Sequence, residues 1–235
     1  MFGGLITPAS WNPGIATPQA WWKPGGYVDA GGGTFNWTPA VNNSGVAAIW
    51  ADATTPPDVH ASGTPSFVRA NGDVLSTTGN WGNYIGTGAM TIALVVDVTN
   101  ITLNAISWQN EPIIFDTGFY CGLYLRNSVT PIGQLIMSYY DTTDRLCTHS
   151  LAATSGLLNI VAQKTSGGLL RITTDGGTNW TNGDTASTLG GGSTMRLGKS
   201  IYGGLNGRIK SIATWNRQLT DTEVRLAYVY GGTLV

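Results

Sequence analysis

Few side chains in this sequence could serve as a pair of catalytic carboxylates. Glycoside hydrolysis needs two Asp or Glu side chains that flank the scissile bond, with separate acid and base or nucleophile roles. The chain has only two glutamates, Glu111 and Glu223, and Pro112 follows the first. Two further carboxylates, Asp141 and Asp144, lie close together in a DTTD segment, which is typical of a turn between strands. We therefore expect no glycosidase activity.

The histidines and cysteines do not form a catalytic or zinc-binding motif either. The spacing of Cys147 and His149 puts both on one face of a strand, so a Cys–His dyad is conceivable. A small buried thiol beside a histidine at the rim is the simpler interpretation, and His60 follows a proline-containing loop. Neither C-x-x-C nor H-x-x-x-H spacing occurs. We expect Cys121 and Cys147 to be free thiols and the chain to be non-enzymatic.

Aromatic residues beside short polar ones offer a different chemistry, carbohydrate binding. A sugar ring presents C–H faces that stack on aromatic rings and hydroxyl edges that accept and donate hydrogen bonds. The chain has nine tryptophans and nine tyrosines, and several flank segments rich in Asn, Thr and Asp. The same residues could equally form cross-strand aromatic pairs. The candidate glycan-facing residues are Trp108, Tyr139, Tyr140 and Trp180.

The elements that must position these residues are mainly strands. Residues alternate between apolar and polar over short segments separated by Gly, Asn and Asp, a pattern typical of a two-layer antiparallel sandwich. The 33 glycines fit such a turn-rich β protein. The expected strands are 47–51, 67–70, 74–75, 91–98, 119–126, 134–140, 157–163, 169–174 and 208–215.

The segment TTDGGTNW, residues 173–180, predicts a hairpin turn. Asp175 is expected to accept hydrogen bonds from the turn amides, Gly176 and Gly177 to adopt positive φ, and Trp180 to pack down. The pattern resembles the Asp-box of sialidase-like propellers. It occurs once here, without the arginine cluster of a sialic-acid enzyme, so we interpret it as a folding element.

The C-terminal quarter predicts a strand, a Gly-rich turn, a second strand and one capped helix. Thr220 and Glu223 have the spacing of a capping box. An apolar stripe follows at helical spacing, and a glycine pair is expected to end the helix. The stripe is Val224, Ala227 and Tyr228, and the pair is Gly231 and Gly232.

This C-terminal pattern resembles the laminin-G-like, or concanavalin A-like, jelly-roll family. The resemblance implies an all-β, antiparallel two-sheet β-sandwich with one short C-terminal helix, and it covers roughly residues 20–230. Glucanases of that fold carry a Glu-x-Asp-x-x-Glu strand, which this sequence lacks. The matching residues are Gly207, Ile209, Ile212, Trp215, Asn216, Arg217, Leu219, Thr220, Glu223 and Val224.

The family resemblance also implies that calcium is a candidate ligand, because laminin-G-like domains often hold Ca²⁺ at the sandwich rim. Carboxylate and carbonyl oxygens are the ligands that this cation prefers. No D-x-D-x-D-G series occurs, so we expect no obligate cofactor and keep calcium as the alternative. The candidate ligands, all in predicted turns, are Asp116, Asp141, Asp144, Asp175 and Asp184.

Residues 1–26 predict an irregular N-terminal arm, and residues 27–235 a single sandwich domain. Prolines recur too often in the first segment for a helix or a central strand. Its tryptophans are candidates for docking on a partner, since tryptophan is enriched at interfaces. Alternatively, these rings cover one end of the sandwich. They are Trp11, Trp21 and Trp22.

The low charge of the chain limits the classes of partner that it could bind. The formal net charge is −1 and 11% of the residues are charged, which argues against nucleic acid or a membrane surface. No secretory signal is evident at the N-terminus. The chain resembles laminin-G-like proteins that tailed bacteriophages carry on heads, tails or fibres. This resemblance implies a virion structural protein that associates with itself and with capsid or tail proteins; the alternative is an extracellular carbohydrate-binding module or adhesin.

Overall fold

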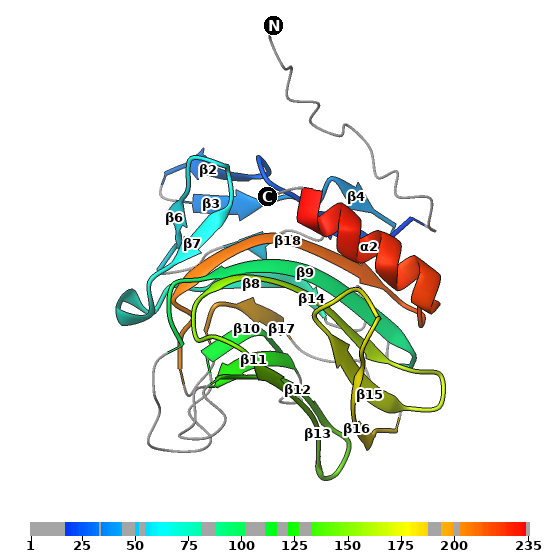
Figure 1. Cartoon of the computed structure of the whole chain (residues 1–235). Helices are drawn as coiled ribbons and strands as arrows, with labels where there is room; N and C mark the ends of the chain where they lie inside the picture. The colour runs from blue at the N-terminus through cyan, green and yellow to red at the C-terminus, as the bar shows by residue number, and fades with distance from the viewer. Residues whose placement is uncertain are drawn as a thin grey trace, which may run out of the picture.

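The computed structural model describes residues 17–32, 34–43, 50–51, 55–80, 88–101, 111–116, 122–126, 133–187, 194–199 and 203–233. Two antiparallel sheets are stacked on each other, and one α-helix lies on the outside (Figure 1). The expected two-sheet antiparallel sandwich with a short C-terminal helix is therefore confirmed. Within the described residues, no helix is long and apolar enough to cross a bilayer.

The first sheet has the strand order β16-β15-β14-β9-β18-β1-β4, and β7 also pairs with β18 and with β6. Every pairing in it is antiparallel. Its strands are β1 Ala20–Trp22, β4 Val41–Asn42, β6 Asp58–Val59, β7 Pro65–Phe67, β9 Met90–Val98, β14 Gly156–Lys164, β15 Leu169–Thr173, β16 Thr181–Thr185 and β18 Gly207–Trp215. The expected strand at 67–70 is wrong, because β7, Pro65–Phe67, is followed by a 3₁₀ turn, Arg69–Asn71.

The second sheet has the order β13-β12-β11-β10-β17-β8-β5-β3-β2. The strands of this sheet are β2 Tyr27–Gly31, β3 Thr34–Trp37, β5 Trp50–Ala51, β8 Leu75–Asn80, β10 Glu111–Asp116, β11 Gly122–Arg126, β12 Gly133–Tyr140, β13 Asp144–Leu151 and β17 Thr194–Leu197.

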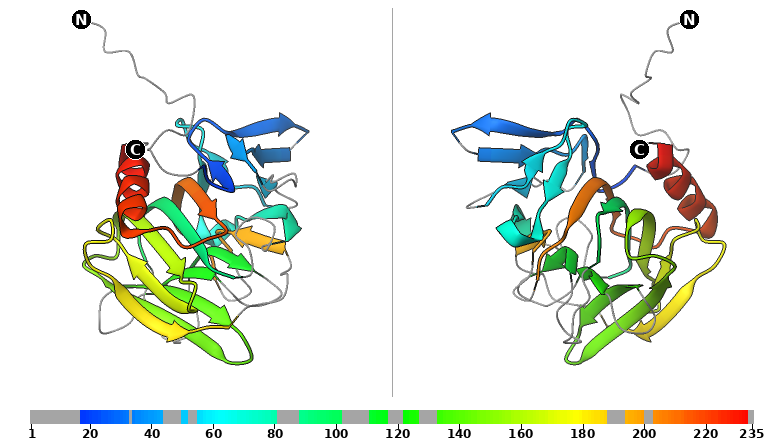
Figure 2. Two further views of the ribbon diagram at one scale, coloured as in Figure 1. Left: turned by 90° about the vertical axis from the view of Figure 1, so that its right-hand side faces the viewer. Right: turned by 60° about the vertical axis from the view of Figure 1, so that its left-hand side comes forward.

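Strand β9 is buried on both faces. Ile92, Leu94 and Val96 point into the main core between the sheets, as the alternating pattern predicts. Ala93, on the other face, belongs to a second apolar cluster that also contains Trp21 and residues of the helix. This strand therefore needs a cover on its outer side, and α2, Asp221–Thr233, provides much of it (Figure 2).

Two buried polar side chains attach the loop before α2 to the sheet. The Thr91 hydroxyl donates to the carbonyl of Arg217 at 2.9 Å and accepts from the amide of Leu219 at 3.1 Å. Gln163 donates to the Leu219 carbonyl at 3.1 Å, and both Thr91 and Gln163 are fully buried. Because buried polar groups are costly unless they are hydrogen-bonded, these bonds define where the helix begins.

The capping box is confirmed. The Glu223 amide donates to the Thr220 hydroxyl at 3.3 Å, and the Thr220 amide donates to the Glu223 carboxylate at 2.9 Å. Arg217 adds two bonds to the same carboxylate, at 3.0 and 2.6 Å. The expected stop at Gly231 and Gly232 is wrong: the helix continues to Thr233, because glycine weakens a helix without preventing helical dihedral angles.

The expected N-terminal arm is wrong from residue 20 onward. Ala20–Trp22 form β1, paired on one side with β18 and on the other with β4. Pro18 precedes the strand and Pro24 follows it, so neither interrupts the pairing. Trp21 and Trp22 are fully buried, and they cannot dock on a partner as proposed; they cover the sandwich instead. Trp11 lies outside the described residues.

We predict that deleting residues 1–26 prevents folding, whereas deleting residues 1–16 does not. The longer deletion removes β1 and two buried indoles, and truncating each buried tryptophan costs about 3–5 kcal/mol, against a total stability of about 5–15 kcal/mol. Thermal unfolding followed by near-ultraviolet circular dichroism measures this. A cooperative transition in the longer deletion would show that β1 is dispensable.

We predict that Glu223→Gln destabilises the protein by about 1–2 kcal/mol at pH 7, the usual range for a lost cap. Hydrogen bonds from Arg217 lower the pKa of Glu223 from 4.5 to about 2. Its contribution is therefore present above pH 4.5 and is lost as the pH falls toward 2. Urea unfolding across this range should show the difference from wild type shrinking with acidity.

Asp221→Asn is the matched control for Glu223→Gln, because Asp221 begins the same helix but its side chain is 68% exposed. We expect it to cost less than about 0.5 kcal/mol, as exposed ion pairs do. Equal losses from the two substitutions would contradict a special role for the Glu223 carboxylate.

Candidate functional site

The edges of the two sheets at β13 and β16 are joined by side chains, and two candidate calcium ligands belong to this seam. Asp141 accepts hydrogen bonds from the amide and hydroxyl of Ser187, at 2.8 and 3.1 Å, and from Arg145 at 3.0 Å. These bonds, the Ser187 amide first, lower the pKa of Asp141 to about 2. Asp184 accepts from the amide of Leu146 at 2.9 Å. Both carboxylates are used to close the sandwich.

Asp175 organises the turn between β15 and β16, as the sequence predicts. Its carboxylate accepts from the Asn179 amide at 3.0 Å, the Asn179 side chain at 2.8 Å and the Thr173 hydroxyl at 2.7 Å. The pKa of Asp175 falls to about 2, chiefly through the Asn179 amide. Gly176 and Gly177 adopt φ of 72° and 85°. The expected hairpin turn is confirmed.

Three of the candidate ligands lie in strands and not in the turns that the sequence predicts. Asp144 is the first residue of β13, and Asp184 lies inside β16. Asp116 is the last residue of β10, and its side chain is not among those that the structure describes. Within the described parts of the chain, no group of three or more His, Cys, Asp and Glu side chains converges. The described residues therefore add no support for the calcium site that the family resemblance suggests.

Cys147 and His149 do share one face of β13, but they do not contact each other as a catalytic pair. The Cys147 thiol donates to the Thr181 carbonyl at 3.2 Å, and burial raises its pKa to about 11. The two ring nitrogens of His149 lie 2.8 Å from the Thr181 hydroxyl and 3.1 Å from that of Thr174. The thiol is therefore protonated at neutral pH. Cys121 lies outside the described residues.

The proposed glycan-facing aromatic residues are not brought together. Tyr139 is 1% exposed and lies in the main core, so its assignment is wrong. Trp180 packs against the cluster beneath α2, with the guanidinium of Arg171 3.8 Å from its ring centroid. Tyr140 is 40% exposed. Trp108 lies outside the described residues. Of the four, Tyr140 is the aromatic side chain that the described structure leaves accessible for stacking.

Tyr140 stands on the outer face of β11, β12 and β13. The odd-numbered residues of these strands, such as Leu123, Leu135 and Cys147, enter the main core, and the even-numbered ones therefore point outward. The pairing register places Tyr140 beside Asp144 and, one step along, Ser138 beside Leu146. The next rows are Tyr124, Ile136 and Thr148, and then Arg126, Gln134 and Ser150. Tyr124, Ile136 and Gln134 are only 7%, 4% and 8% exposed, so the accessible part of this face is its edge around Tyr140 and Asp144.

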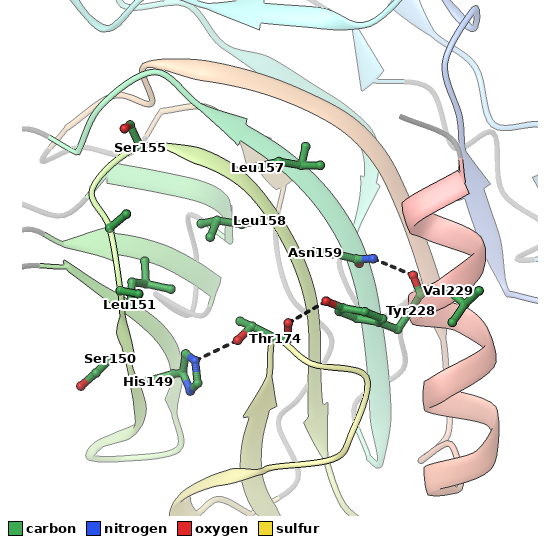
Figure 3. A pocket seen from close by; sticks show the side chains of 12 residues that line it. His149, Ser150, Leu151, Ser155, Leu157, Leu158, Asn159, Thr174, Tyr228 and Val229 are labelled. Atoms are coloured by element: carbon green, nitrogen blue, oxygen red, sulfur yellow. Dashed lines mark hydrogen bonds between the residues drawn. The ribbon is translucent and has the colours of Figure 1, made fainter.

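A groove of about 580 Å³ forms a second site, at the opposite end of β13 (Figure 3). A chain of hydrogen bonds crosses it: His149 to Thr174, the Tyr228 hydroxyl to the Thr174 carbonyl at 2.8 Å, and Asn159 to the Tyr228 carbonyl at 2.6 Å. The rest of the lining is mainly aliphatic and includes Leu151, Leu157, Leu158 and Val229.

The sequence predicted neither the outer face of β11–β13 nor the groove. The groove takes residues from β13, β14, the turn after β15 and α2, and no local motif links them. The alternation in β12 and β13 was the available signal for the outer face. It predicts which residues share a face of one strand, but not which strands are neighbours.

No protein-family model matches this chain, and neither does any curated protein sequence. Solved structures show the same fold at low sequence identity. A sialidase of Trypanosoma rangeli matches 92% of this chain and 33% of its own, with a TM-score of 0.59 and 12% identity. The binding domain of botulinum neurotoxin serotype D/C matches 93% of this chain and 52% of its own, with the same score and identity.

A third similar structure is that of a botulinum neurotoxin type C protein, described as depending on two ganglioside molecules for cell entry. It matches 69% of this chain and 40% of its own, with a TM-score of 0.51 and 10% identity. The present chain thus spans about two fifths of that structure. At these identities the likeness concerns the fold, a β-sandwich found in both binding domains and an enzyme.

Proposed function

We propose that this chain is a non-enzymatic carbohydrate-recognition subunit of a virus particle, carried on the capsid, tail or fibre. The observation that supports it most directly is the outer face of β11–β13, where Tyr140 is exposed beside hydroxyl and carboxylate groups. An aromatic ring next to fixed polar groups is what a sugar requires. Several described side chains that could perform catalysis or bind metal are already engaged in structural bonds.

The glycan site is centred on Tyr140. Its ring offers a stacking surface for the C–H face of a sugar, while Ser138 and Asp144 lie beside it on the same face of the sheet. These two residues supply a hydroxyl and a carboxylate to bond sugar hydroxyls. The strands hold them at the fixed spacing of a sheet, which lowers the entropy lost when a ligand binds. The ganglioside named for the neurotoxin relative supports a sugar as ligand.

The non-enzymatic assignment rests on how the reactive groups are used. Glu223 caps α2 and pairs with Arg217. The Cys147 thiol has a raised pKa and donates to a carbonyl, and the ring nitrogens of His149 bond threonine hydroxyls. A nucleophile needs an adjacent base that can take its proton, and the thiol of Cys147 donates to the Thr181 carbonyl rather than to His149.

The virion setting is proposed from the sequence. Low charge, many glycines and the resemblance to phage-borne laminin-G-like proteins support it. If it holds, the chain should co-sediment with intact particles in a density gradient, detected with an antibody. Recovery only at the top of the gradient, with unassembled protein, would contradict it.

We predict that Tyr140→Ala abolishes retention on a glycan array while the melting temperature stays within about 2 °C of wild type. The ring is 40% exposed, so its removal leaves the core intact, while loss of one stacking ring costs about 1–3 kcal/mol of binding, by analogy with base stacking on aromatic side chains.

Tyr140→Phe separates stacking from hydrogen bonding, because it keeps the ring and removes the hydroxyl. Leu157→Ala is the matched control, since Leu157 is 48% exposed but lines the groove instead. We expect it to leave glycan retention unchanged. Retention by Tyr140→Ala at the wild-type level would exclude this face as the sugar site.

A further inference from the structure

The groove beside α2 is suited to an apolar chain segment rather than to a sugar. Leu157 and Val229 are 48% and 57% exposed, and both line the groove, the first from β14 and the second from α2 (Figure 3). Leu151 and Leu158 extend the apolar lining. Exposed aliphatic side chains gathered in one hollow are unfavourable in water, and they mark interaction surfaces in soluble proteins.

The polar groups of the groove are largely bonded to each other. His149, Thr174, Tyr228 and Asn159 form the chain of hydrogen bonds described above. None of the described residues that line the groove is Asp, Glu, Lys or Arg. Burial also lowers the pKa of His149, which favours its neutral form. An occupant therefore meets an uncharged surface with few polar groups left to bond, and a charged segment would be disfavoured by desolvation.

The N-terminal segment of this chain has the matching composition. Residues 1–16 read MFGGLITPASWNPGIA and contain no Asp, Glu, Lys or Arg; the first such residue in the chain is Lys23. Phe2, Leu5, Ile6 and Trp11 are large apolar side chains that an apolar groove can bury. Prolines restrict the backbone before binding, so such a segment loses less entropy when it docks.

The segment is also long enough and starts close enough. Sixteen extended residues span at most about 55 Å, whereas a chain of this size has a radius of gyration of about 18 Å. It joins the described structure at Thr17, just before β1, and Trp21 of β1 lies 5.7 Å from the ring of Tyr230 on α2. Val229, the neighbour of Tyr230, lines the groove.

We propose that the groove formed by Leu151, Leu157, Leu158 and Val229 binds the N-terminal segment, residues 1–16, of this chain. The contact holds the segment against α2 of its own subunit or of a neighbouring copy. It is independent of the sugar site, because the groove lies at the end of β13 near Leu151 and Tyr140 pairs with Asp144 at its beginning. His149, the groove residue of β13 nearest to this pair, lies five positions from Asp144, about 17 Å along the strand.

The test uses the full chain with the photo-cross-linker p-benzoylphenylalanine in place of Leu157. After illumination and digestion, mass spectrometry should identify cross-linked peptides from residues 1–16. The same cross-linker in place of Tyr140 is the matched control and should give none of these peptides. A monomeric band on a denaturing gel then indicates docking within one subunit, and a dimeric band docking between copies; both support the proposed contact.

A second variant tests the groove itself. Val229→Asp places a carboxylate on its wall and should lower the yield of the cross-link about tenfold or more, because burying an unpaired charge is costly. Val59→Asp is the control: Val59 is 44% exposed and lies on β6, outside the groove. Cross-links from position 157 that never include residues 1–16, or a yield unaffected by Val229→Asp, would overturn the proposal. Neither result would affect glycan retention, so the two proposals fail separately.

Discussion

The burial of β9 on both faces is the constraint on which the rest of this structure depends. Its inner face faces the second sheet, as in any sandwich, but the outer face would expose Ala93 and Val95 to water without α2 and β1. Thr91 on that face positions α2, because its buried hydroxyl forms hydrogen bonds with the loop that leads into the helix. The capping box, the Arg217–Glu223 pair and the buried Trp21 all follow from the need to cover this strand.

A second requirement, closing the seam between β13 and β16, uses two aspartates, a cysteine and a histidine. Asp141, Asp184, Cys147 and His149 all bond across the seam or to the turn beside it. Hydrogen bonds from amides and hydroxyls there replace a regular ladder of strand pairing. These side chains, which look available for catalysis or metal binding in the sequence, thus have structural roles, and the two surfaces that we propose for recognition lie elsewhere.

Local patterns predicted what depends on neighbours in the sequence. The strand at 91–98, the turn around Asp175 and the Thr220–Glu223 cap are all confirmed, since each is defined by residues within a few positions of one another. The errors came from residues whose role depends on distant partners. Trp21 and Trp22 resembled a partner-docking arm because prolines flank them, yet β18, nearly 200 residues later, pairs with them. Tyr139 and Tyr140 are adjacent, and only the sheet decides which one is buried.

The sequence by itself determined the fold class, the helix cap and the alternation of each strand, because these follow from periodicity and short-range hydrogen bonding. Only the tertiary structure decided which residues meet in the two surfaces that we propose as sites. The groove is assembled from segments that begin at His149, pass through β14 and end on α2, some 80 residues later, and the outer face needs three strands in register. Neither can be read from one segment, because strand order and helix docking depend on long-range burial that a local pattern does not encode.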